Sequence, residues 1–350
     1  MRIAQIAPLY EAVPPKLYGG TERVVSFLTE ELVALGHQVT LFASADSVTS
    51  AELAPITPRA LRLDPGVRDA VAPHMLMLET VMQRARDFDV LHFHLDYWPF
   101  SLFSRQRVPF VTTLHGRLDL PELQPVFEAF AQIPVVSISD AQRRPLPQAR
   151  FVGTVLHGLP VDLLRPQPVQ PKYLAFLGRI CPEKRPDRAI RIARQAGIPL
   201  KIAAKVDRAD VDYFNTTIRP MLDGHGVEMV GEIGDAQKAD FLSGAAALLM
   251  PIDWPEPFGL VMIEAMACGT PVIAFNRGSV PEVIEHGVTG FIVEGETDAV
   301  AAIARLDALP RAGVRRGFEQ RFTARRMALD YLALYQGLGA DRRPRLRAVG

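Results

Sequence analysis

The feature that most constrains the fold of this chain is a regular alternation between short apolar runs and longer amphipathic segments. Runs of this length are typical of buried parallel strands, and the segments between them are typical of connecting helices. In the first half the runs fall at residues 2–7, 38–43, 89–94, 110–115, 134–138 and 151–156. The clearest helix is predicted over residues 21–35, where apolar residues recur every three or four positions and Gly36 provides a left-handed residue after the end.

The alternation is interrupted by a proline-rich stretch at residues 163–171 and then starts again. Three prolines within six residues exclude both a helix and a central strand, so this stretch is predicted to connect two domains. Further strands are predicted at residues 172–178, 200–205, 227–231, 246–251 and 271–275, and helices at 186–196, 235–243 and 258–267. We therefore expect two α/β domains, 1–165 and 166–321, then an amphipathic helix at 322–338 and a flexible tail at 339–350.

Composition excludes several functions. The 39 basic and 39 acidic residues cancel, which disfavours nucleic-acid binding. Two cysteines, Cys181 and Cys268, are too few for a disulfide framework, and no Cys/His cluster has zinc spacing, so we expect a reducing cytoplasmic location and no metal. The sequence offers neither a signal-peptide core nor an apolar run of about 18 residues, which leaves only peripheral membrane contact open.

A pair of glycines, Gly19 and Gly20, joins the loop after the first strand to the first helix. Glycines allow close backbone approach, and the N–H groups at a helix start attract anions, so a phosphate could bind here. A tight turn without a ligand explains the same residues. The G-x-G-x-x-G fingerprint of dinucleotide-binding proteins is absent, which disfavours an NAD-dependent dehydrogenase.

Two cations, Arg179 and Lys184, follow the first strand of the second domain. Together they could neutralise a diphosphate and stabilise it as a leaving group, at the sheet edge where ligands of open α/β proteins bind. Two basic residues in a solvated loop are the simpler explanation.

Two carboxylates, Glu256 and Glu264, stand eight residues apart around a predicted helix start with Pro257 at its first position. On a continuous helix they would lie roughly 12 Å apart along the axis and within about 80° of each other. That span fits a sugar at one end and a ribose at the other, since both offer hydroxyls to a carboxylate. Glu256 could instead answer the helix dipole, whereas Glu264 is the only charge in its apolar run and is costly to bury unpaired.

Three histidines, His92, His94 and His115, lie at the ends of two apolar strands, close to Asp96, and could hold a sugar hydroxyl or a phosphate. Histidines satisfied within the core are the alternative, and the spacing gives a metal site little support. Tyr97 and Trp98 follow in the next loop and could either stack on an acceptor or belong to the core.

Taken together, these segments resemble the retaining glycosyltransferases of family 4, the glycogen-synthase-like group 1 glycosyltransferases. The matching residues are 18–22, 113–116, 137–139, 157–162, 178–184 and 256–274. The specific part is the Glu-x7-Glu pattern followed by Ala-x-Ala-x-Gly-Thr-Pro-Val. The resemblance implies the α/β GT-B architecture, in which two doubly wound Rossmann-like domains face each other across a cleft and the C-terminal helix at 322–338 crosses back to the first domain.

The resemblance also implies roles for individual residues. Arg179 and Lys184 would hold the donor diphosphate, Glu256 a hydroxyl of the donor sugar, Glu264 the ribose, and His115 the sugar near its anomeric carbon. The remaining donor contacts would come from Gly19, Gly20, Gly231, Glu232, Ile233, Phe258, Gly259 and Leu260. Acceptor contacts would come from His94, Tyr97 and Trp98.

The implied reaction is transfer of a hexose from a nucleotide diphosphate sugar to an acceptor hydroxyl with retention by front-face attack, without a cofactor or metal. UDP-glucose is the expected donor, with GDP-mannose next, and the acceptor is a small molecule, glycan or lipid. His157 stands where the family more often has asparagine, which puts the local turn in doubt. A sugar-nucleotide epimerase of the same fold and a non-catalytic nucleotide-sugar-binding protein are the alternatives.

Overall fold

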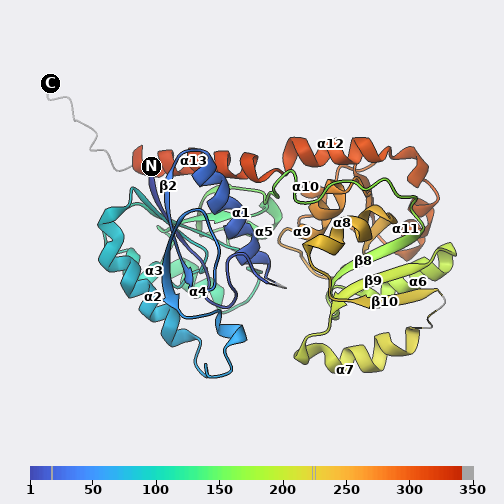
Figure 1. Ribbon diagram of the computed structural model, residues 1–350, viewed down its shortest axis with the longest axis horizontal. Helices are drawn as coiled ribbons and strands as arrows, with labels where there is room; N and C mark the ends of the chain where they lie inside the picture. Colours follow the sequence, from blue (N-terminus) through green and yellow to red (C-terminus); the bar gives the residue numbers. More distant parts are fainter. Residues whose placement is uncertain (17–18, 223, 225, 341–350) are drawn as a thin grey trace. The chain divides into compact units, whose positions relative to one another are not determined.

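The computed structural model describes residues 1–16, 19–222, 224 and 226–340, with backbone only for 339 and 340 (Figure 1). The chain forms two compact units. Of the described residues, unit 1 contains those within Met1–Ile138, Arg143–His157 and Ala324–Ala340, and unit 2 contains those within Ser139–Gln142 and Gly158–Thr323. The chain thus passes into unit 2 at Gly158, before the boundary expected at 165, and the predicted tail from 341 lies outside the described residues.

Unit 1 is built on a parallel sheet whose strand order is β3-β2-β1-β4-β5-β6-β7. The strands are β1 Arg2–Ile6, β2 Gln38–Ser44, β3 Glu52–Thr57, β4 Val90–Phe93, β5 Phe110–Thr113, β6 Pro134–Ser137 and β7 Arg150–Thr154. Because all strands run in the same direction, the loops after β1, β4 and β5 leave the sheet at one carboxyl edge. Strands β1 and β4 are neighbours in the centre, so their ends lie side by side.

Helices cover this sheet. They are α1 Gly20–Ala34, α2 Val71–Arg84, α3 Phe100–Phe103, α4 Leu123–Ala129 and α13 Ala324–Ala340, with short turns Leu61–Leu63 and Ala85–Asp87. The short helix α5 Asp140–Arg143 belongs to unit 2 except for its last residue. Helix α13 lies against α1 (Figure 1). It buries Tyr331 and Tyr335 completely, and it approaches β7 so closely that a Cβ on Gly153 would lie 2.9 Å from Leu334 Cδ2. The last helix of the sequence is therefore part of the core of unit 1.

Unit 2 repeats the same winding with a parallel sheet of order β10-β9-β8-β11-β12-β13. Its strands are β8 Tyr173–Arg179, β9 Leu200–Lys205, β10 Val227–Gly231, β11 Ala245–Met250, β12 Val272–Phe275 and β13 Gly290–Val293. Its helices are α6 Pro186–Ala196, α7 Val211–Tyr213, α8 Asp235–Ser243, α9 Leu260–Ala267, α10 Val280–Val283, α11 Glu296–Ile303 and α12 Arg311–Arg321, with short turns Arg208–Asp210, Phe214–Ile218, Arg219–Met221 and Leu306–Ala308.

The predicted α/β class with parallel sheets is confirmed, and two strands were missed. Strand β3 is an edge strand that contains Pro55, and its side chains are half-buried or exposed, so it lacks the apolar run of a central strand. Strand β13 has only four residues and begins at Gly290, where a Cβ would lie 2.1 Å from the Val272 carbonyl oxygen. The close contact with β12 thus requires glycine at this position, and glycine is a residue type that does not indicate a strand.

Candidate functional site

The carboxyl edge of the sheet in unit 2 brings Lys184 and Glu256 together. Lys184 lies in the loop after β8 and Glu256 in the loop after β11, and these two strands are neighbours. The Lys184 ammonium contacts Glu256 Oε2 and lies 4.9 Å from the centre of the Trp254 ring. The Trp254 indole N–H donates to the same carboxylate oxygen at 2.9 Å. Asp253 N–H donates to the Glu183 carbonyl at 2.9 Å, so the two loops are also joined through their backbones.

The Glu256 backbone is held from behind by the loop after β12. Gly278 has φ 54°, and a Cβ there would lie 2.3 Å from Glu256 O and 2.4 Å from Glu256 N. The Ser279 N–H donates to Glu256 O at 2.9 Å, and the Ser279 hydroxyl donates to Phe258 O at 2.8 Å. Only glycine permits this approach, and the position of the buried Glu256 depends on it.

The predicted helix start at Pro257 is wrong. Helix α9 begins at Leu260, because Gly259 before it has φ 80° and turns the backbone out of the helical region. Glu256 therefore stands in a loop, and the separation derived from a continuous helix does not apply to it. Phe258 is buried, and the residues from Phe258 to Leu260 form the turn into α9.

Glu264 lies on α9, is 3% exposed, and has a partner that the sequence alone did not reveal. Lys238 on α8 donates to Glu264 Oε1 at 2.6 Å and lies 3.5 Å from an Asp235 oxygen. Glu264 is therefore not buried unpaired, and a cation of this chain offsets the cost of its burial.

Arg179 ends β8 and faces two carboxylates after β9. Its guanidinium lies 3.8 Å from Asp207 and 3.6 Å from Asp210, and its side chain is 38% exposed. The structure therefore gives Arg179 and Lys184 different partners. Gly231 ends β10 with φ 85°, and Glu232 after it is exposed.

In unit 1 the glycine pair lies at the start of α1, which begins one residue earlier than predicted. A Cβ on Gly19 would lie 2.8 Å from Pro15 Cβ, so the approach of this proline requires glycine. Helix α1 begins at Gly20, and Glu22 in its first turn is buried, which raises the pKa of its carboxyl. Tyr18 lies outside the described residues.

The three predicted histidines lie together at the carboxyl edge of unit 1, with a fourth beside them. The His94 ring joins Gln5 Oε1 through Nε2 and His115 Nε2 through Nδ1, each at 2.8 Å. His157 stacks on His115, with ring centres 5.3 Å apart and an angle of 18° between the planes. His92 lies under His94, with ring centres 4.1 Å apart.

Burial keeps these rings neutral. Desolvation lowers the pKa of His115 to about 3 and holds the pKa values of His92, His94 and His157 well below their ordinary value. Next to them Asp96 has φ 48°, and burial raises its pKa to about 6 despite a hydrogen bond from the His115 backbone. A left-handed aspartate with a raised pKa at this edge is a second marker of a functional site, and the sequence identified it only as a neighbour of the histidines.

The two aromatic residues assigned to an acceptor have different surroundings. Tyr97 is 39% exposed, whereas Trp98 packs against the core and meets His74 edge-on with ring centres 4.8 Å apart. Among the described residues no three His, Cys, Asp or Glu side chains are arranged to hold a metal ion. Within the same ranges no helix combines the length and the apolar character needed to span a bilayer.

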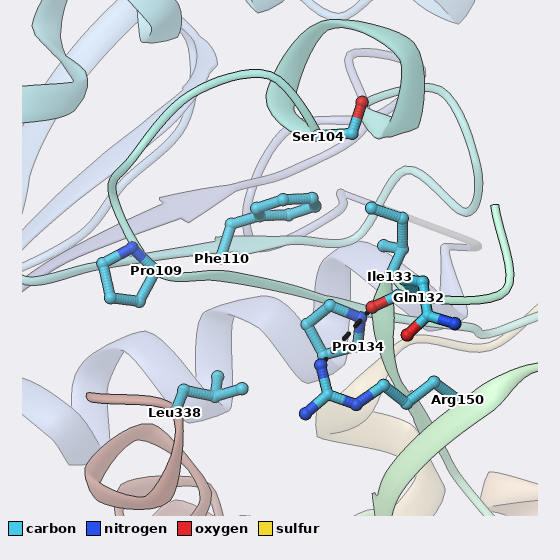
Figure 2. Close-up of a pocket in the computed structure, with 8 residues that line it drawn as sticks. All are labelled: Ser104, Pro109, Phe110, Gln132, Ile133, Pro134, Arg150 and Leu338. Atoms are coloured by element: carbon cyan, nitrogen blue, oxygen red, sulfur yellow. Dashed lines mark hydrogen bonds between the residues drawn. The ribbon is translucent and has the colours of Figure 1, made fainter. Parts of the chain in front are cut away.

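A pocket of about 440 Å³ lies at the other edge of the sheet of unit 1 (Figure 2). It is lined by residues at the amino ends of strands, including Phe110, Pro134 and Arg150, and by Leu338 of α13. The Arg150 guanidinium donates to the Gln132 carbonyl at 3.4 Å. None of the candidate site residues lines this pocket.

Comparison with known proteins agrees with this architecture. Residues 165–315 match the family described as "Glycosyl transferases group 1", and residues 18–134 match "Glycosyltransferase Family 4". The chain belongs to the group 1 glycosyltransferases of GT-B architecture and is family 4-like.

Individual relatives are more distant. D-inositol 3-phosphate glycosyltransferase of Mycobacterium tuberculosis is 30% identical over 191 residues, which cover 47% of this chain and 38% of that protein. The chain therefore matches well under half the length of this curated relative. Among solved structures, AviGT4, a glycosyltransferase of avilamycin A biosynthesis, is 24% identical with a TM-score of 0.74 over 97% of this chain and 98% of that one. HepE of Anabaena, solved with UDP and glucose, is 17% identical with a TM-score of 0.73 over 96% of this chain and 99% of that one.

Proposed function

We propose that the chain transfers a hexose from a nucleotide diphosphate sugar to an acceptor hydroxyl with retention of configuration. The observation that carries this proposal is the contact of Lys184, Glu256 and Trp254 at the carboxyl edge of unit 2. A cation and a carboxylate that hold each other before a ligand arrives are the two groups that a sugar diphosphate needs: one binds the phosphate charge and the other accepts a sugar hydroxyl.

In this proposal the donor separates the pair. Lys184 turns to the diphosphate and stabilises the negative charge that develops as it leaves, together with Arg179. Glu256 accepts a hydrogen bond from a hydroxyl of the sugar, and the Trp254 N–H keeps the freed carboxylate oriented. The backbone N–H groups from Phe258 to Leu260 complete the donor site.

Glu264 would accept the ribose hydroxyls while Lys238 keeps its charge balanced. The base would contact the backbone at Gly231, Glu232 and Ile233, directly after β10. In unit 1, Gly20 could offer an N–H group to a phosphate, and His115 could offer a ring nitrogen to a sugar hydroxyl. Of the two aromatic residues assigned to the acceptor, Tyr97 is the exposed one.

The reaction balances without a cofactor or a metal ion. The acceptor oxygen forms a bond to the anomeric carbon while the bond from that carbon to the diphosphate oxygen breaks. The proton of the acceptor passes to an oxygen of the departing diphosphate, on the same face of the sugar, so the configuration is retained.

UDP-glucose is the proposed donor. Support comes from HepE of Anabaena, a structural neighbour solved with UDP and glucose. A thermal-shift panel of UDP-glucose, UDP-galactose, UDP-N-acetylglucosamine and GDP-mannose tests this, because a ligand of the folded state raises the melting temperature by mass action. We expect the largest rise with UDP-glucose. A rise with GDP-mannose alone would refute the choice of base, and no rise with any donor would refute a donor site.

Incubation of the protein with the same four nucleotide sugars, followed by analysis of the products over time, separates sugar transfer from other reactions. Conversion of the donor into a second nucleotide sugar without an acceptor would identify an epimerase. Binding with neither transfer nor hydrolysis would identify a non-catalytic nucleotide-sugar-binding protein.

A further inference from the structure

A continuous chain of hydrogen bonds runs from His115 to helix α13. His115 Nε2 and His94 Nδ1 are 2.8 Å apart, His94 Nε2 lies 2.8 Å from Gln5 Oε1, and Gln5 Nε2 donates to the Tyr335 hydroxyl at 3.2 Å. Gln5 and Tyr335 are almost completely buried, and His94 is 3% exposed. These contacts lie within unit 1 and join β1, the loops after β4 and β5, and α13.

A second arm continues the chain beneath the histidines. The Tyr335 hydroxyl lies 2.6 Å from His92 Nδ1, and His92 Nε2 lies 2.7 Å from the Thr113 hydroxyl, which is 2.9 Å from the Tyr331 hydroxyl. His92, Thr113 and Tyr331 are fully buried. Both tyrosines of α13 therefore take part in one network with the histidines.

With the Gln5 amide oriented as in the structure, the protons of the chain can be assigned. Its Oε1 can only accept, so His94 must carry its proton on Nε2. His94 is neutral because burial holds its pKa well below its ordinary value, so its Nδ1 has a lone pair. The short contact between the two histidines then requires a proton on His115 Nε2, and the Nδ1 of neutral His115 is left as an acceptor.

We propose that Gln5, His94 and Tyr335 are positioning residues that hold His115 as the Nε2–H tautomer, so that its Nδ1 accepts a hydrogen bond from a ligand hydroxyl. An acceptor nitrogen selects a group that carries a proton, such as a sugar hydroxyl, and rejects a bare phosphate or carbonyl oxygen. The nature of this ligand rests on the proposed function, whereas the tautomer itself does not.

Rotation of the Gln5 amide by half a turn would reverse every hydrogen bond of the chain. The amide nitrogen would then donate to His94, His94 would donate to His115, and His115 would present an N–H group that selects phosphate or carbonyl oxygens instead. The Tyr335 hydroxyl is the acceptor that holds the Gln5 amino group away from His94. Helix α13 thus determines the polarity of a hydrogen bond that is offered at the carboxyl edge.

Nitrogen NMR of the full-length protein labelled with ¹⁵N-histidine tests this directly, because a protonated and an unprotonated ring nitrogen have distinct chemical shifts. The His115 resonances are identified by their loss in His115→Asn. In the ligand-free protein we expect Nε2 of His115 to be protonated and Nδ1 unprotonated. A protonated Nδ1, or an averaged signal from both tautomers, would overturn the proposal without any reference to activity.

Variants then test the cause. Gln5→Glu keeps an acceptor toward His94 and should keep the tautomer, whereas Gln5→Leu and Tyr335→Phe should give a mixture of both tautomers and lower kcat/KM for the donor about tenfold. Tyr173→Phe is the control, because it likewise removes one hydrogen-bonded tyrosine hydroxyl, here a half-buried one in unit 2 that donates to the Phe241 carbonyl at 2.7 Å. An unchanged His115 spectrum in Tyr335→Phe would show that α13 does not hold the tautomer of His115. A wild-type spectrum as expected, together with no turnover of any nucleotide sugar, would instead refute the proposed function alone.

Discussion

At the residue scale, the position of Glu256 depends on residues of two other loops as well as on its own. Lys184 and Trp254 hold its carboxylate, and Gly278 lies against its backbone. Two of these three contacts join different loops of unit 2. A short motif around Glu256 therefore describes only part of what makes this carboxylate available to a ligand.

Gly278→Ala tests this arrangement. The new Cβ would overlap the backbone of Glu256 and displace its carboxylate, so we expect turnover of the donor to fall at least tenfold in a protein that still folds. Gly287→Ala is the matched control, because Gly287 also has positive φ but a Cβ added there would meet no atom within 4 Å. Urea unfolding should show a loss of about 1–2 kcal/mol in Gly287→Ala from the left-handed backbone, and a larger loss in Gly278→Ala because of the overlap with the Glu256 backbone. Equal turnover in the two would show that Gly278 does not position Glu256.

At the element scale, the buried pair of Lys238 and Glu264 joins α8 to α9. Removing one partner leaves an uncompensated buried charge, so Lys238→Met and Glu264→Leu should each cost about 3–5 kcal/mol in the free energy of unfolding. The double variant should recover most of this loss, because no charge then remains. Urea unfolding of the four proteins measures the coupling, and a double variant that loses the sum of the two single losses would contradict it.

Elements with a strong local signal were predicted well. Helices α6 and α8 and strands β9 and β10 begin and end at the residues expected from the sequence. Strand β3 was missed because its side chains are not buried in an alternating or continuous apolar pattern. The start of α9 was predicted too early, because proline at position 257 is typical of a first helical residue. The left-handed backbone of Gly259 prevents a helix before Leu260.

The sequence predicted those parts of the candidate site that lie in short motifs or at strand ends, but not the partners that other elements bring to them. The gathering of His94 and His115 follows from strand ends that share one edge. The roles of Gln5, Tyr335 and Lys238 could not be predicted, because each depends on which distant element lies opposite it. Glu264 is an example: its expected burial predicted a positively charged partner, but no local pattern distinguished Lys238 from the other basic residues.

At the scale of the whole molecule, the two units should respond differently to acid. All six histidines of unit 1 have a lowered pKa, for which burial is the leading cause: His37, His74, His92, His94, His115 and His157. Their stabilisation is present above the ordinary pKa of 6.5 and is lost as pH falls toward the folded values, because the unfolded chain then binds protons that the folded chain does not. Asp96 and Glu22, whose pKa values are raised, act in the opposite direction but are outnumbered.

The four histidines of the cluster alone give a slope of up to about 5 kcal/mol per pH unit below pH 6. The two tryptophans of the chain, Trp98 in unit 1 and Trp254 in unit 2, allow each unit to be followed by fluorescence in Trp254→Phe and Trp98→Phe respectively. We expect the Trp98 signal to report unfolding at a higher pH than the Trp254 signal. Loss of both signals at the same pH would contradict this expectation.

We propose above that Lys184 stabilises a departing nucleoside diphosphate, and one comparison tests this role most directly. Proton NMR of UDP-glucose incubated with the wild-type protein and with Lys184→Ala measures the release of UDP over hours, and urea unfolding of both proteins verifies that the variant is folded. We predict that UDP appears with the wild type and at least a hundredfold more slowly with Lys184→Ala. Equal rates of UDP release from the two folded proteins would contradict the claim.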